Sequence, residues 1–192
     1  MDVGHAFRDA LTVSEARRAR RIVRATFAGL FAVLVPGHAG AGSPPDPCSL
    51  LSDEDVRALQ GHPVLQRVPS AQPPRRFRVA QCVYRTPEIT HSVSVAVTSP
   101  LTAGPPGAVS AYWKERFSPD AGAVPAKKDP PRPVTGLGDA AFWVGDRVTG
   151  ALYVLKGDVF VRISVGGVRE EGPRLERTKA LASRLVERLG DP

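Results

Sequence analysis

The segment ALYVLKGDVFVRISV, residues 151–165, is the starting point for the fold that we expect of this chain. In its second half apolar side chains recur at every second position, which puts Val159, Val161, Ile163 and Val165 on one face. A period of two is typical of a strand with one buried side. Gly157-Asp158 separates this run from a second apolar run, and such a dipeptide favours a tight turn between antiparallel strands. The stretch therefore predicts a β-hairpin with strands over 151–155 and 159–165.

An amphipathic helix is expected after this hairpin. One side carries a stripe at three-to-four-residue spacing, made of Leu175, Thr178, Leu181-Ala182, Leu185 and Leu189, and charged residues occupy the other side. Pro173 suits the first helical position and Gly190 suits a helix end. The pattern predicts a helix over 174–189 that packs on a sheet. A helix lying on a membrane surface is the alternative, which its mixed charge and its place after three strands disfavour.

Two more strands and two more helices are expected upstream. Alternation returns in residues 77–84 and 92–98, which predicts two strands joined by a short hairpin. Ser52 followed by three acidic residues is typical of a helix start, and predicts a helix over 53–60. A third helix is expected over 108–117. The whole predicts an α+β fold: one antiparallel sheet of about five or six strands, with all three helices packed on it.

The amino-terminal 42 residues have the pattern of an export signal. Five arginines between 17 and 24 precede an apolar run over 25–35, and small residues follow up to Gly42. This order of a basic, an apolar and a small-residue region is typical of a secretory leader. The apolar run is shorter than the roughly 20 residues that span a bilayer. The acidic residues among the first sixteen indicate either a start further along the chain or an unusually long leader.

These features divide the chain into an export signal over 1–42, a proline-rich tether over 43–47 and one α+β domain over 48–190. The formal net charge is +7, but six of the 26 basic residues and three of the 19 acidic ones precede residue 43. The remaining basic residues are scattered, whereas nucleic-acid-binding domains gather them on one face or in one run. We therefore expect no nucleic-acid partner. We also expect an exported location, periplasmic or extracellular, without a stable membrane anchor after cleavage.

Cys48 and Cys82 are the only cysteines. An even number of cysteines in an exported chain predicts a disulfide, here one that ties the start of the domain to a strand. A lipid anchor on Cys48 is the first alternative, but Ser43-Pro44-Pro45-Asp46-Pro47 is not the apolar, small-residue segment that lipidation requires. A catalytic thiol is the second alternative, and it would need a histidine partner such as His62 or His91.

Motifs that would indicate an enzyme, a metal site or a cofactor are not found in the sequence. There is no dinucleotide-binding, phosphate-loop, zinc-protease or paired-cysteine pattern, and no nucleophile elbow. With two histidines after the leader and no spaced ligands, we expect neither a metal site nor a cofactor. A hydrolase remains an alternative. It would require a cleft that brings together groups such as His91, Asp139, Asp146 and Asp158.

Three short motifs occur in order: DPCSLL at 46–51, CVY at 82–84 and GLGDAAFW at 136–143. Together they resemble small exported proteins and lipoproteins of unknown function that are common in high-GC bacteria. The resemblance covers nearly all of residues 48–189 and supplies no catalytic residues. It implies a released, soluble form, because this chain has no cysteine in its leader. It also supports the disulfide and implies an α+β sandwich similar to the PsbP/Mog1 type.

The function expected from these features is a non-enzymatic binding or accessory protein of the cell envelope, with an envelope protein or a small ligand as its partner. A hydrolase is the first alternative to this function. The second is a secreted inhibitor that inserts the proline-rich loop over 118–133 into a partner. A ligand surface is expected where aromatic and arginine side chains could gather. The candidates are Tyr112, Trp113, Trp143, Arg75, Arg76 and Arg78. The competing interpretation is that both tryptophans belong to the core.

Overall fold

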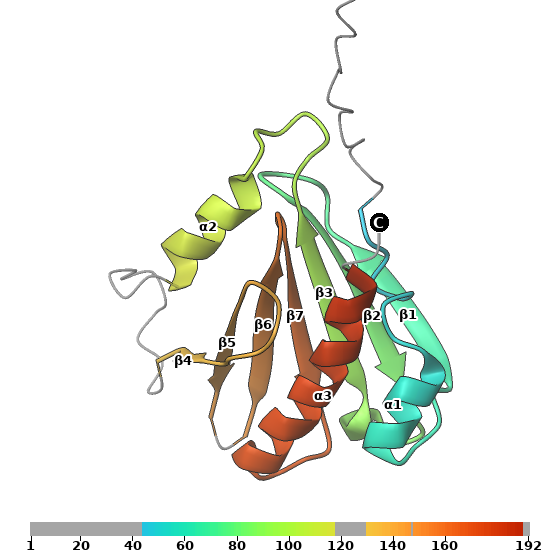
Figure 1. Cartoon of the computed structure of the whole chain (residues 1–192). Coiled ribbons are helices and arrows are strands. Elements are labelled where there is room, and N and C mark those ends of the chain that lie inside the picture. Colours follow the sequence, from blue (N-terminus) through green and yellow to red (C-terminus); the bar gives the residue numbers. More distant parts are fainter. Residues whose placement is uncertain (1–43, 118–129, 147, 190–192) are drawn as a thin grey trace, which may run out of the picture. The chain divides into compact units, whose positions relative to one another are not determined.

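The computed structural model describes residues 44–117, 130–146 and 148–189. These residues form seven strands and three α-helices around one antiparallel sheet, whose strand order is β1-β2-β3-β7-β6-β5-β4 (Figure 1). The strands are β1 (Gln66–Ala71), β2 (Arg78–Arg85), β3 (Val93–Ser99), β4 (Arg132–Pro133), β5 (Ala140–Gly145), β6 (Gly150–Lys156) and β7 (Val159–Val165). The helices are α1 (Asp53–Gln60), α2 (Ala108–Phe117) and α3 (Glu171–Leu189), with a short 3₁₀ turn η1 (Ile89–His91). The α+β prediction, with one antiparallel sheet, is confirmed.

The hairpin of β6 and β7 lies at the centre of this sheet. Its two-residue turn begins at Gly157, whose φ of 58° is a conformation that favours glycine. β7 pairs with β3 on its other side, so the strands of the two halves of the domain join here. Residues distant in sequence, such as Val95 and Ile163, are therefore direct neighbours.

The sheet has seven strands and not the predicted five or six. β1 and β4, the two edge strands, match none of the strands expected from the sequence. In β1 all residues but Val68 are exposed, so there is no alternation of apolar and polar residues to recognise. β4 has only two residues. Edge strands pair on one side alone, and their sequences carry the weakest signal of a sheet.

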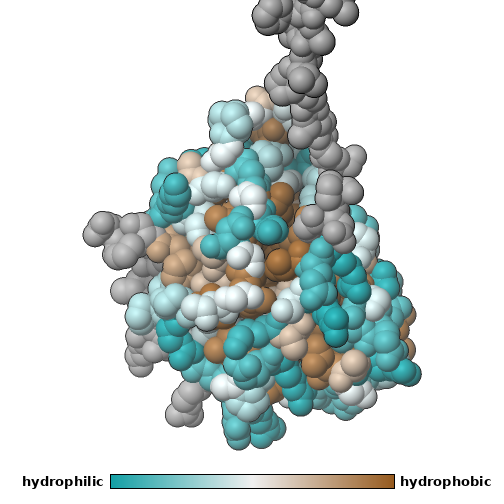
Figure 2. Space-filling view, viewed as in Figure 1, coloured by the Kyte–Doolittle hydropathy of each residue, from teal (hydrophilic) through white to brown (hydrophobic). Residues whose placement is uncertain are grey.

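One face of the sheet is covered by α1 and α3 (Figure 1). We call it the α1/α3 face. Valines of β3 and β7, with Tyr84, Trp143 and Leu152, meet the apolar sides of the two helices here, and most of these side chains are fully buried. Hydrophilic side chains cover much of the outer surface around α1 and α3, and hydrophobic residues show between α2 and the C-terminal part of α3 (Figure 2). The amphipathic helix thus packs on the sheet, as predicted.

The opposite face, the α2 face, carries a smaller aromatic cluster. Trp113 and Phe117 of α2 meet Phe142 and Phe160 of the sheet, with ring centroids between 4.4 and 5.9 Å apart. Polar groups also lie on this face: the Gln81 amide donates to the Ser94 hydroxyl, and Arg162 donates to the hydroxyl of Tyr153, whose ring lies 5.4 Å from that of Phe117. α2 therefore covers one part of its face only.

The helix boundaries agree with the prediction except at the start of α3. Ser52 caps α1 through a capping box with Asp55, and Gly61 ends the helix with φ 75°. α3 begins at Glu171 and not at Pro173, so Pro173 lies within its first turn. The first turn of a helix needs no backbone N–H donors, and proline is therefore tolerated there. In the described ranges no helix is long and apolar enough to cross a membrane.

The amino-terminal end of the domain is fixed by a disulfide and two hydrogen bonds. Cys48 and Cys82 form the predicted disulfide, with Cα atoms 5.2 Å apart. The buried Tyr84 hydroxyl donates to the carbonyl of Pro47 at 2.8 Å and accepts from the backbone N–H of Leu51 at 3.2 Å. Burial raises the pKa of Tyr84, so it stays a neutral donor. Pro47 is itself buried, so the packed domain begins before Cys48, inside the segment predicted as a tether.

α1 is also tied to the end of α3. Arg188 donates to the carbonyl of Leu50 and pairs with the Asp55 carboxylate, both at 2.7 Å. Burial acts to raise the pKa of Asp55, but hydrogen bonds from the hydroxyl and backbone N–H of Ser52, together with Arg188, outweigh it. The pKa of Asp55 therefore lies below its ordinary value of 3.8.

Candidate functional site

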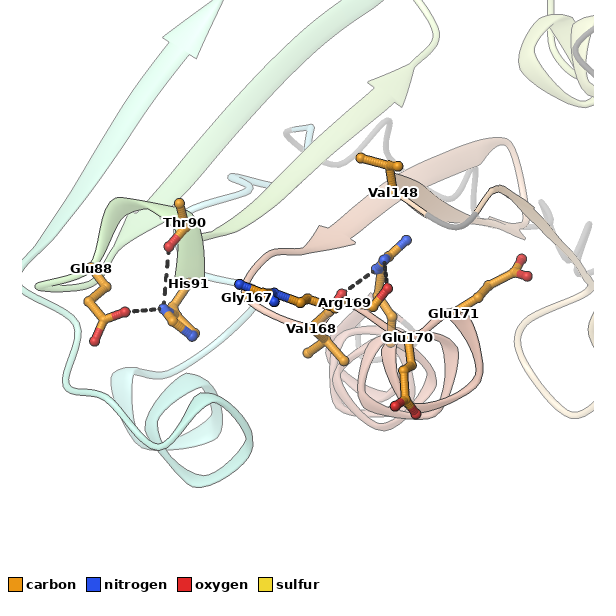
Figure 3. A pocket seen from close by; sticks show the side chains of 10 residues that line it. Glu88, Thr90, His91, Val148, Gly167, Val168, Arg169, Glu170 and Glu171 are labelled. Atoms are coloured by element: carbon orange, nitrogen blue, oxygen red, sulfur yellow. Dashed lines mark hydrogen bonds and ion pairs between the residues drawn. The ribbon is translucent and has the colours of Figure 1, made fainter.

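A cavity of about 900 Å³ opens at the end of the sheet where β7 leads into α3. One side is formed by η1 and the residues beside it, the other by the connection from β7 to α3 and by its first turn (Figure 3). Charged side chains from both sides surround the opening. The lining residues are Glu88, Thr90, His91, Val148, Gly167, Val168, Arg169, Glu170, Glu171 and Arg174.

Two glycines allow the backbone after β7 to pack closely against the η1 side of the cavity. A Cβ atom on Gly166 would lie 2.0 Å from the carbonyl oxygen of Thr90, and one on Gly167 would lie 2.0 Å from the ring of His91. The connection after β7 can pass this closely only because both positions lack a side chain. Gly167 also has φ 76°. The imidazole of His91 therefore rests directly on backbone, which restricts its orientation.

Three potential ligand groups meet at this corner. The His91 Nδ1 atom lies 2.9 Å from a carboxylate oxygen of Glu88, and the rings of His62 and His91 have centroids 4.8 Å apart. One ring nitrogen of each histidine and one carboxylate oxygen of Glu88 all lie within 4.8 Å of one another. Two imidazoles and one carboxylate are a donor set that zinc accepts. The sequence predicts no metal site, yet the fold brings these residues together.

Gln60 also contacts this corner, through hydrogen bonds from its side chain to the backbone. It is 4 % exposed, and its amide nitrogen donates to the carbonyl oxygens of His91 and of Gly166, the latter at 3.2 Å. Its Oε1 atom is buried and has no hydrogen-bond partner within the described ranges. Buried acceptors are nearly always paired in proteins. The Gln60 side chain thus joins the end of α1 to the backbone of His91 and Gly166, and its oxygen is an exception to this rule.

The α3 side of the cavity is held by Arg174, which is 2 % exposed. Its guanidinium donates to the carbonyl oxygens of Val168, Asp146 and Arg169, at 2.8 to 3.1 Å. The neighbouring Glu171 accepts from the indole nitrogen of Trp143 at 2.8 Å and also contacts Arg132. Because these groups bond to the protein itself, they give this side a fixed shape.

The predicted ligand surface is only partly assembled. Arg76 lies over the rings of Phe77 and Tyr112, at 5.2 and 5.4 Å from their centroids, and contacts Glu115. Trp113 is buried in the aromatic cluster of the α2 face, at 4 % exposed. The remaining predicted residues do not join this group. Arg75 is exposed, and Arg78 lines a separate hollow of about 620 Å³ together with Pro44 and Pro45.

Trp143 is the clearest departure from that predicted surface. It belongs to the α1/α3 face, so the sheet itself separates it from Trp113. It is fully buried, and its ring fills the space beside Gly150, where a Cβ atom would lie 2.2 Å from it. Both tryptophans are thus core residues, which was the competing interpretation.

The four residues considered for hydrolysis lie at opposite ends of the sheet. Asp158 precedes β7 and accepts hydrogen bonds from the backbone N–H groups of Val109 and Ser110, at the start of α2. Asp139 accepts from Gly157 at the same end. Asp146, in the turn from β5 to β6, lies at the other end, as does His91. The three carboxylates each accept from backbone N–H groups, which is typical of turns and helix caps.

His62, Glu88 and Gln60 are residues that sequence reasoning did not select for the site. Gln60 ends α1, whereas His62 and Glu88 lie in two connections that are remote in sequence, and no local motif surrounds them. The only available signal is the Gly166-Gly167 pair after a strand, because adjacent glycines there indicate a close backbone approach. Comparison with known proteins finds no family model, no curated protein and no solved structure that matches the chain.

Proposed function

We propose that this chain is an exported, non-enzymatic binding or accessory protein of the cell envelope. The leader pattern over 1–42 and the Cys48–Cys82 disulfide support export, since disulfides persist in oxidising compartments. The resemblance to small exported proteins of unknown function is part of the same proposal. So is a sandwich fold of the PsbP/Mog1 type.

The cavity at the end of the sheet is the observation that carries the binding function. It has about 900 Å³ of space, within the range of ligand sites, and its rim combines carboxylates with arginine. Arg169 and Glu170 are both exposed at this rim. An envelope partner or small ligand with charged groups would suit such an opening, because charge complementarity selects partners and speeds their association.

The positions of the acidic residues support binding over hydrolysis. A hydrolase would need a general base and a nucleophile or activated water within hydrogen-bond reach of each other. Asp139 and Asp158 lie at the other end of the sheet from His91. Asp146 lies at the end that holds His91, but its carboxylate accepts from Val148 and Thr149 in the turn.

The secreted-inhibitor alternative depends on the loop over 118–133. Residues 118–129, including Lys127 and Lys128, lie outside the described residues. Arg132 and Pro133 form β4, which pairs with Trp143 and Phe142 of β5. These two residues therefore belong to the edge of the sheet, and they give no support to the inhibitor alternative.

The binding function is tested by capture from envelope extracts. The full-length oxidised chain is immobilised as wild type, as Arg169→Ala and as Arg177→Ala; Arg177 is exposed on α3 and does not line the cavity. We expect specific capture by the wild type, at least about a tenfold loss with Arg169→Ala, and no loss with Arg177→Ala. Equal capture by all three proteins, or no specific capture, contradicts a partner at this cavity.

Export is tested separately in a bacterial host. We expect the protein outside the cytoplasm with its amino terminus near residue 42 and both cysteines oxidised. Recovery of the intact chain from the cytoplasm with free thiols would contradict this part of the proposal.

A further inference from the structure

We propose that His62, Glu88 and His91 bind a divalent transition-metal ion, and that zinc is the ion that suits them best. The inference deepens the binding function proposed above, because Glu88 and His91 also line the cavity. It identifies a ligand class for that cavity and is open to a direct test.

The geometry comes close to what a metal requires. The three ligand atoms lie within 4.8 Å of one another. A tetrahedral zinc ion with bonds of about 2.0–2.2 Å separates its ligand atoms by roughly 3.3–3.5 Å. The side chains therefore need to approach by no more than about 1.5 Å. Glu88 is 59 % exposed and can move by rotation of its own side chain.

The donor types select the class of metal. Two imidazole nitrogens and one carboxylate oxygen suit zinc and its neighbours among the transition metals, whereas magnesium and calcium prefer oxygen ligands alone. Three protein ligands leave a fourth position in a tetrahedral site. Since Glu88 and His91 border the cavity, a molecule in the cavity has access to an ion held at this corner.

The backbone around the site is already fixed. His62 follows Gly61, which ends α1 in a left-handed conformation, and His91 ends η1 against the bare backbone of Gly167. Gln60 holds the carbonyl of His91. These supports reduce the conformational entropy lost when an ion binds.

An ion pair without metal accounts for part of this arrangement only. It explains why His91 Nδ1 lies 2.9 Å from Glu88. It gives no role to His62, whose ring contacts that of His91. A metal ion gives His62, Glu88 and His91 a common role.

The test is a titration of the full-length oxidised chain with Zn²⁺ at neutral pH, measured by calorimetry on protein purified without a histidine tag. We expect one ion per chain, and at least about tenfold weaker binding in His62→Ala, in His91→Ala and in Glu88→Gln. Because Glu88 is largely exposed, Glu88→Gln keeps the test valid if a histidine variant folds poorly. The matched control is His5→Ala with His38→Ala, which removes the other two histidines and should leave binding unchanged.

A second readout is spectroscopic. Co²⁺ in place of zinc should give the visible absorption of a four-coordinate site, and this absorption should be lost in the same three variants. No binding of Zn²⁺, binding that none of the three variants weakens, or binding that follows His5 and His38 overturns the inference. Arg169-dependent capture without zinc affinity refutes the metal site alone, whereas zinc binding without such capture refutes the proposed function alone.

Discussion

The two faces of the sheet differ in how completely they are covered and in how firmly the covering elements are held. The α1/α3 face is closed by two helices, a disulfide and an ion pair that joins its first and last elements. The α2 face carries one helix, and half-buried arginines lie beside its aromatic rings: Arg116 and Arg162 lie 5.5 and 6.0 Å from the ring centroid of Tyr153. The stability of this domain is therefore concentrated on one face, and substitutions on the second face should lower the free energy of unfolding less.

Replacing the tryptophans one at a time tests this asymmetry with the largest expected effect. Trp143→Ala should lower the free energy of unfolding by about 4–5 kcal/mol, because its ring fills space against the backbone of Gly150 that nothing else can fill. Trp113→Ala should cost about 3 kcal/mol, since Trp113 borders an opening of about 540 Å³ beside α2. Denaturant unfolding measures both losses, and a larger loss for Trp113→Ala would reverse the ranking of the faces.

Removing the disulfide should destabilise the α1/α3 face alone. Cys48 and Cys82 are 34 residues apart, and a loop of that length predicts a loss of about 3–4 kcal/mol in the chain-entropy treatment. We expect this loss for the double Cys→Ala variant, measured by thermal unfolding against the wild type. Reduction of the wild type with a thiol is the control and should produce a similar loss. An unchanged melting temperature would show that the helices alone hold this end of the domain.

Helix caps offer a matched pair, one on each face. Asp158→Ala removes an acceptor for the backbone N–H groups of Gly107, Val109 and Ser110 and should cost about 2 kcal/mol. Ser52→Ala removes the cap of α1 and should cost about 1 kcal/mol. Hydrogen exchange should locate each effect.

Asp158→Ala should speed exchange in α2 while α3 stays protected. Faster exchange throughout the domain after Asp158→Ala would mean that the two faces unfold together and that the asymmetry is not local.

The pH dependence of stability is the smallest expected effect. The pKa of Asp55 is lower in the folded chain than its ordinary value of 3.8, so its ionised form stabilises the fold above that pH. This contribution is lost as the pH falls through the folded pKa. Asp55→Asn should therefore be less stable than the wild type at neutral pH, and the difference should narrow below pH 3.8. Arg188 is 40 % exposed, so its part of the effect should stay below about 1 kcal/mol.

Unfolding curves at several pH values measure this difference between Asp55→Asn and the wild type. A constant difference across the acid range would show that Asp55 acts by its hydrogen bonds alone and not by its charge.

Much of the fold could be predicted because its signals are local. The turn at Gly157-Asp158, the leucine stripe of α3 and the alternation around Val95 each belong to one short segment. The edge strands were missed because burial on one side imposes little pattern. The start of α3 was misplaced because proline is allowed at more than one position of a first turn.

The candidate site could not be predicted because no local pattern encodes it. His62 and His91 are separated by β1 and β2, and their approach depends on how α1 and η1 pack at the end of the sheet. Trp113 and Trp143 show the opposite failure. Both are aromatic and central in the sequence, but a count of residue types cannot tell which face of the sheet each one packs on.

The disulfide also determines how the domain would respond to a pulling force. Tension on the chain ahead of Cys48 passes through the sulfur bridge directly into β2, next to the sheet edge. α1 and β1 lie within the bridged loop and carry none of that load. An oxidised domain pulled from its amino terminus should therefore resist as a sheet under shear. After reduction, the 34-residue segment between the two cysteines would extend first and lengthen the chain before β2 bears the force.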